Sequence, residues 1–143
     1  MSILDVDNLI EDDSIHIQKW LNENCKIYGT YTIKDNIVDV DGSVGLDFDV
    51  QSIDVQFGVV TRNFVCSHCK YLTSLKGCPR EVGGTFDCSY CIALHTIDFL
   101  PEKVGKMTNM KGNQIYNIDE KLMPLHNERV ERQLMKYIIK PNF

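Results

Sequence analysis

The sequence has no long hydrophobic run, although apolar residues make up 43% of its 143 residues. No stretch approaches the roughly 20 consecutive apolar residues that a membrane-spanning helix needs, so we expect no contact with a membrane. Residues 1–14, MSILDVDNLIEDDS, lack the basic start and the apolar core of a secretory signal peptide. We therefore expect the protein to stay in the cytoplasm in which it is made.

The motifs of the common enzyme classes are missing as well. The sequence contains no glycine-rich phosphate loop, no GxSxG turn around a nucleophilic serine and no HExxH zinc helix. The aspartates between residues 39 and 54 lack the ligand spacing and the closing glutamate of a calcium loop. We expect a protein without enzymatic activity and without a cofactor.

Acidic and basic residues are distributed unevenly along the chain. Residues 1–57 contain 12 acidic and 3 basic side chains, whereas residues 58–143 contain 8 acidic and 12 basic ones. An acidic lobe repels the phosphates of nucleic acids and attracts basic protein surfaces. The charge pattern therefore favours a protein partner with a basic surface over nucleic acid. The oligomeric state stays open.

What the sequence does contain is a repeat of 22 residues, seen in VTRNFVCSHCKYLTSLKGCPRE at 60–81 and VGGTFDCSYCIALHTIDFLPEK at 82–103. The matched pairs are Val60/Val82, Phe64/Phe86, Cys66/Cys88, Ser67/Ser89, Cys69/Cys91, Leu72/Leu94 and Pro79/Pro101. Segments 38–59 and 104–125 fit the same template with weaker identity. Self-similarity at this period is typical of a short solenoid of leucine-rich-repeat type, here with about four repeats.

Segments with helical and hairpin patterns flank the repeats. Residues 13–24 and 126–140 carry apolar side chains at helical spacing, and two β-type runs around residues 34–36 indicate a hairpin. The sequence therefore predicts one α+β domain, residues 1–143. Its expected parts are an N-terminal arm, helix and hairpin cap over 1–37, repeats with one strand each over 38–125, and a C-terminal capping helix over 126–143.

Alternation along the expected strands separates core from surface. Residues two apart on a strand share one face, and Phe and reduced Cys are readily buried, so Phe64 and Cys66 should point inward. The expected columns are Val44, Cys66, Cys88 and Met110, and Gly42, Phe64, Phe86 and Thr108. At the turn after each strand, the small side chains of Cys69, Cys91 and Asn113 should hydrogen-bond backbone groups that lack partners.

The opposite face of the strands points to solvent, and repeat proteins use such extended faces for recognition. The candidate partner-binding residues on this face are Asp41, Ser43, Asn63, Val65, Thr85, Asp87, Met107 and Asn109.

The phrase CSxCxxLTSLxGxPxxVGG, which runs from Cys66 to Gly84, resembles cysteine-containing leucine-rich repeats. In this form it is similar to small leucine-rich-repeat-like proteins encoded by large tailed bacteriophages. The resemblance covers roughly residues 17–118 and implies a binding scaffold of phage origin, acting in the host cytoplasm. We expect a non-enzymatic interaction module, a phage accessory protein that binds and modulates or inhibits a host or defence protein.

Two other functions stay open. The spacing Cys66-x2-Cys69-x18-Cys88-x2-Cys91 is that of a zinc ribbon, which would make the protein a zinc-binding module that contacts nucleic acid or protein. Against zinc, one duplicated repeat produces two CxxC pairs automatically, and neither pair is followed by the glycine of a zinc knuckle. The other alternative is a structural protein that self-assembles through open repeat edges.

Overall fold

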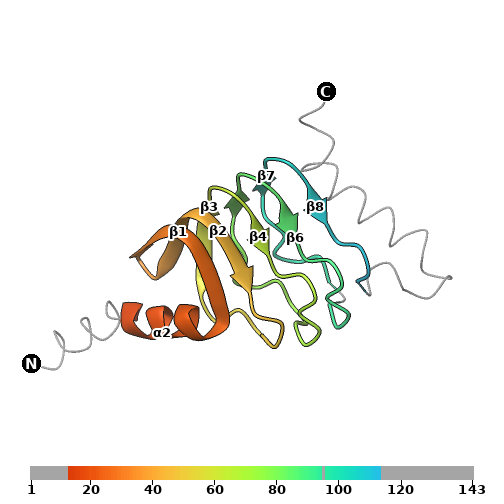
Figure 1. The fold of residues 1–143 in the computed structure, drawn as a ribbon, viewed down its shortest axis with the longest axis horizontal. Helices are drawn as coiled ribbons and strands as arrows, with labels where there is room; N and C mark the ends of the chain where they lie inside the picture. Colours follow the sequence, from red (N-terminus) through yellow and green to blue (C-terminus); the bar gives the residue numbers. More distant parts are fainter. Residues whose placement is uncertain (1–12, 95, 114–143) are drawn as a thin grey trace, which may run out of the picture.

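The chain winds into a β-solenoid of parallel strands that is preceded by one helix and one long hairpin (Figure 1). The computed structural model describes residues 13–94 and 96–113. The expected C-terminal helix, 126–143, and most of the last expected repeat lie outside the described residues. Within the described part, no helix is both long enough and apolar enough to cross a bilayer.

Helix α2, Ser14–Asn24, confirms the helix expected at residues 13–24. Its apolar stripe lies on the core, where Ile17 and Leu21 are buried and Trp20 is partly buried. Asp13 is the residue before the first turn, but its side chain makes no capping hydrogen bond. Packing of the stripe therefore holds this 11-residue helix in place, as expected for a helix too short to be stable alone.

Strands β1, Cys25–Lys34, and β2, Ile37–Leu46, form the expected hairpin. The two residues between them, Asp35 and Asn36, have φ angles of 52° and 61°. Positive φ at both central residues defines the type I′ turn, and Asp and Asn adopt this conformation more easily than most residues. The hairpin is confirmed, and it is longer than the short runs that predicted it because all ten residues of each strand pair.

Two glycines allow the hairpin to bend at the point where β2 stops pairing with β3 and begins pairing with β4. Gly29 and Gly42 face each other across the strands, with φ angles of 136° and 147°. A Cβ atom at Gly42 would collide with the carbonyl oxygen of Tyr28. At this point β2 changes partner, because Val40 aligns with Val60 before the corner and Val44 aligns with Phe64 after it.

Each later turn contributes two short strands, so the expectation of one strand per repeat is wrong. The first ladder contains β3, Gln56–Val60, β5, Glu81–Val82, and β7, Lys103–Val104. The second contains β4, Phe64–Val65, β6, Phe86–Asp87, and β8, Thr108–Asn109. A three-residue corner separates the ladders, which explains why Val60 stands four residues before Phe64 while both side chains point inward.

The core follows the 22-residue period. Phe64 stacks on Phe86 with 5.8 Å between ring centroids, and Phe57 meets Phe64 edge to face at 5.2 Å. Both members of the pair Leu72 and Leu94 are fully buried. The predicted stacking of equivalent Phe side chains is confirmed.

The alignment of β2 with β4 differs by two residues from the alignment that the 22-residue period predicts. Val44 aligns with Phe64, not with Cys66, and Gly42 is therefore not part of the phenylalanine column. The reason is that the chain from Val44 to Val60 is two residues shorter than the equivalent chain from Phe64 to Val82 one turn later. A shift of two residues leaves every inward side chain inward, since strands alternate with a period of two. The alternating valines of β2 fit both registers, so the sequence does not distinguish them.

Candidate interaction surface

Five of the eight residues predicted to bind a partner lie on strands, and the other three, Asn63, Thr85 and Met107, lie in the corners just before β4, β6 and β8. Asp41, Asn63 and Met107 are exposed, and the other five are half-buried. Val65, Asp87 and Asn109 form one column in consecutive turns. The residues therefore lie along the strands and the corners next to them, while their role in binding stays a prediction.

Several polar groups of these residues are already occupied by contacts between turns. The amide N–H of Asn63 donates to Ser43 Oγ at 3.1 Å, and the amide N–H of Thr85 donates to Asn63 Oδ1 at 2.9 Å. The hydroxyl of Thr61 donates to the carboxylate of Asp41 at 3.0 Å. These side chains continue the hydrogen bonding of the coil where the strands end, so they have less capacity left for a partner.

A second surface, which the sequence reasoning missed, lies on the loops that follow β2, β4 and β6. In Figure 1 these loops form a row at the ends of the three strands. Three rings stack along them and form what we call the ring ladder, Phe48, His68 and Tyr90. His68 and Tyr90 are 5.0 Å apart and nearly parallel, at 23°, and Phe48 meets His68 edge-on at 6.4 Å.

The ring ladder is exposed and is held by an unusual backbone. Phe48 is 70% exposed and Tyr90 is 41% exposed. His68 and Tyr90 have φ angles of 63° and 56°, and Gly112, at the same position one turn later, has 79°. A left-handed conformation costs a non-glycine residue about 1–2 kcal/mol. Strain of this kind is concentrated at functional sites, and here it directs two rings toward solvent.

The loops that carry the ring ladder also carry other exposed apolar side chains. Tyr71 is 50% exposed and Ile92 is 55% exposed, and the ammonium group of Lys70 lies 5.2 Å from the centre of the Tyr71 ring. With Phe48 and Tyr90, these loops hold four of the nine large hydrophobic side chains that are exposed in the described residues. A concentration of exposed apolar groups marks an interaction site more often than single exposed residues do.

The sequence contains a weak signal for this surface. His68 and Tyr90 stand at equivalent positions, each between the Ser and the second Cys of the CSxC phrase. Taken alone, an exposed His is ordinary polar surface, and Phe48 falls out of register because its loop is shorter. Only the stacked geometry shows that the three rings belong together.

The four cysteines of the two CxxC pairs lie in the core. Cys66, Cys69, Cys88 and Cys91 are all fully buried, and all are free thiols. The thiol of Cys69 donates to the carbonyl oxygen of Asp47 at 3.3 Å, and that of Cys91 donates to the carbonyl oxygen of Cys66 at 3.0 Å. The predicted role of these small side chains at the turn is confirmed.

Asn113 takes the same role one turn later. Its side-chain oxygen accepts the amide N–H of Cys91 at 3.0 Å, and its side-chain nitrogen lies 3.8 Å from the sulfur of Cys88. A buried Asn that satisfies a backbone amide of the preceding turn stabilises the coil, because an unpaired buried amide is costly.

The thiols also touch one another. Contact with the thiols of Cys66 and Cys69 lowers the pKa of Cys91, and the contact with Cys91 raises the pKa of Cys69. Cys66 has its pKa raised by contact with Cys78 and then with Cys91, followed by burial. Within residues 13–94 and 96–113, however, no group of three or more His, Cys, Asp or Glu side chains is arranged to hold a metal ion. The absence of a cofactor stays a prediction.

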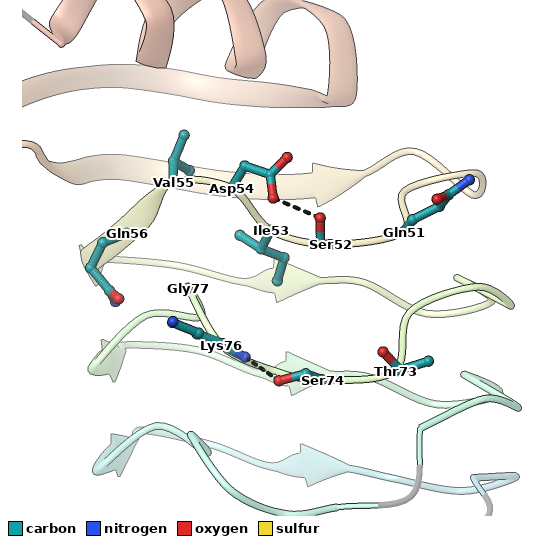
Figure 2. A pocket seen from close by; sticks show the side chains of 10 residues that line it. All are labelled: Gln51, Ser52, Ile53, Asp54, Val55, Gln56, Thr73, Ser74, Lys76 and Gly77. Carbon is teal, nitrogen blue, oxygen red and sulfur yellow. Dashed lines mark hydrogen bonds between the residues drawn. The ribbon is translucent and has the colours of Figure 1, made fainter.

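A hollow of about 490 Å³ lies on the third side of the coil, between the loops of the first two turns (Figure 2). The hydroxyl of Ser52 donates to the Asp54 carboxylate at 2.6 Å, and Ser74 Oγ accepts the amide N–H of Lys76 at 3.1 Å. Thr96 accepts the N–H of Asp98 in the same way one turn later. The recurrence of the bond made by Ser74 and Thr96 indicates that these groups stabilise turns.

Comparison with protein-family models, curated proteins and solved structures finds no match for this chain.

Proposed function

We propose that this protein is a non-enzymatic protein-binding module that recognises its partner through the ring ladder and the apolar side chains around it. The observation that supports this most is the pair His68 and Tyr90, two exposed rings on left-handed backbone. Aromatic side chains on a rigid support are the residues that most often carry binding energy at protein interfaces. The outer strand face with Val65 and Met107 extends the same interface.

The biological setting is part of the proposal. The repeat phrase that resembles phage-encoded leucine-rich-repeat-like proteins supports a phage accessory protein that binds and modulates or inhibits a host or defence protein in the host cytoplasm. The acidic excess in residues 1–57 supports a partner with a basic surface. In this proposal, residues 114–143 complete a fourth repeat and end in a capping helix.

Affinity capture tests the proposal with a matched pair of variants. Immobilised full-length protein should recover one partner from bacterial lysate in stoichiometric amount, and Tyr90→Gly should lose it. The control is Phe99→Gly, since Phe99 is also exposed, at 57%, and also left-handed, at a φ of 70°. If Tyr90→Gly retains the partner, or if Phe99→Gly loses it equally, the ring ladder is not the binding surface.

A further inference from the structure

A second, smaller hollow lies at the first rung of the ring ladder. It measures about 360 Å³ and is lined by Leu46, Asp47, Phe48 and Asp49. Leu46 is nearly buried and provides an apolar floor, whereas the Phe48 ring beside it is 70% exposed. The hollow therefore combines apolar surface with two exposed acidic residues and stands open to a ligand from solvent.

Among residues 13–94 and 96–113, no cation forms an ion pair with the acidic residues of this hollow. In the described part of the chain, neither Asp47 nor Asp49 forms an ion pair through its carboxylate. Lys26 lies on the adjacent strand opposite Gly45 and makes no ion pair with them.

Helix α2 adds to the negative potential. The carbonyl oxygen of Asn24, its last residue, accepts the amide N–H of Asp47 at 2.9 Å. The helix therefore ends beside the hollow, and its last turn contains no basic residue. The C-terminal end of a helix carries a partial negative charge that favours cations, so three independent groups attract positive charge to one place.

From this geometry we infer that the hollow binds a cationic side chain, an arginine, of the protein partner. The inference depends on the proposed function and names the chemistry of the group that the partner inserts. The aliphatic stem of an arginine packs on Leu46 and Phe48. Its planar guanidinium stacks on an aromatic ring and donates to carboxylates in a way that the ammonium of lysine does not.

Titration of the full-length protein with N-acetyl-arginine amide, followed by NMR, tests this assignment. The amide signals of residues 46–49 should shift and saturate in the millimolar range, and the lysine analogue should bind several-fold more weakly. The citrulline analogue has the same shape without the charge, and it should bind at least about tenfold more weakly, as the loss of a charge-assisted contact implies. Equal binding of arginine and citrulline, or saturation at other residues only, would overturn the assignment.

Substitutions in the hollow test whether its residues bind the arginine amide. Phe48→Ala and Asp49→Asn should each weaken binding of the arginine amide about fivefold or more, in line with one lost cation–π or charged contact. The matched controls are Phe99→Ala and Asp54→Asn, which make the same changes at exposed residues outside this hollow. Unchanged binding in Phe48→Ala and Asp49→Asn would refute the inference.

Capture of the partner by variants distinguishes a wrong arginine assignment from a wrong proposed function. If Tyr90→Gly loses the captured partner while Asp47→Asn combined with Asp49→Asn retains it, the arginine assignment is wrong and the proposed function stands. If the arginine amide binds as described but Tyr90→Gly captures the partner normally, the hollow is a cation site and the ring ladder is not the interface.

Discussion

The ring of Tyr90 lies between two residues of neighbouring turns, with the imidazole of His68 at 5.0 Å on one side and Gly112 on the other. All three residues have a left-handed backbone. Position 112 has no room for a side chain, because a Cβ atom at Gly112 would collide with the Tyr90 ring.

Gly112→Ala should therefore lower the free energy of unfolding by about 1–2 kcal/mol, from the strained φ and the collision together. Urea unfolding measures this loss. In the Tyr90→Gly background the collision is absent, so the same substitution should cost less, with a coupling of about 0.5 kcal/mol or more. Equal costs in both backgrounds would mean that Tyr90 and Gly112 do not pack together.

Phe64→Ala should be among the most damaging single substitutions in the described core. Phe64 is fully buried between Phe57 and Phe86, and removal of a buried Phe side chain costs about 3–5 kcal/mol. Phe48→Ala removes the same atoms from a side chain that is 70% exposed, and it should change stability by less than about 0.5 kcal/mol. Chemical denaturation of both variants compares them, and similar losses would contradict the arrangement of the core.

The stacking of Phe64 on Phe86 could be predicted because the 22-residue period repeats without insertion between these turns. The paired strands of each turn could not be predicted, since a two-residue strand such as β4 is too short to show alternation. The register of β2 was ambiguous for a different reason, because its valines at alternate positions suit two alignments equally well.

The candidate surface, too, could be predicted from the sequence only in part. Outward residues such as Asn63 were placed correctly by alternation alone, but their hydrogen bonds to the next turn depend on distances that the sequence does not contain. To predict the ring ladder, three features would have to be known together: the short loop that brings Phe48 to His68, the left-handed turns, and the stacking of rings from different turns. None of these follows from residue type.

Alkaline conditions should destabilise the protein in a way that depends on Cys25. Burial, and then the nearby charge of Asp47, raises the pKa of this thiol from its ordinary value of 9.0 to about 12. Between these values the unfolded chain loses the proton while the folded chain keeps it, so the stabilisation present below pH 9 decreases as the pH rises. The thiol should contribute a slope of up to about 1.4 kcal/mol per pH unit.

The variant Cys25→Ala isolates this contribution. Its difference from the natural protein at pH 7 gives the structural cost of the substitution, including the hydrogen bond from the thiol to the carbonyl oxygen of Leu21. Between pH 9 and pH 11 its unfolding free energy should decline less steeply than that of the natural protein. Parallel declines in both proteins would show that Cys25 ionises as freely when folded as when unfolded.

The variant Cys91→Asn distinguishes the buried thiols of a coil from the thiolates of a zinc site. Asn113 occupies the repeat position of Cys91 and accepts a backbone amide of the preceding turn. An Asn at position 91 can make the equivalent bond to the amide of Cys69, so Cys91→Asn should fold and lose no more than about 2 kcal/mol, a typical cost for a conservative core change. A zinc ligand could not be replaced in this way, because amides do not substitute for thiolates in structural zinc sites. Thermal unfolding with and without a chelator, together with metal analysis, distinguishes the two: about one zinc per chain, lost together with the fold in Cys91→Asn, would establish the zinc module instead.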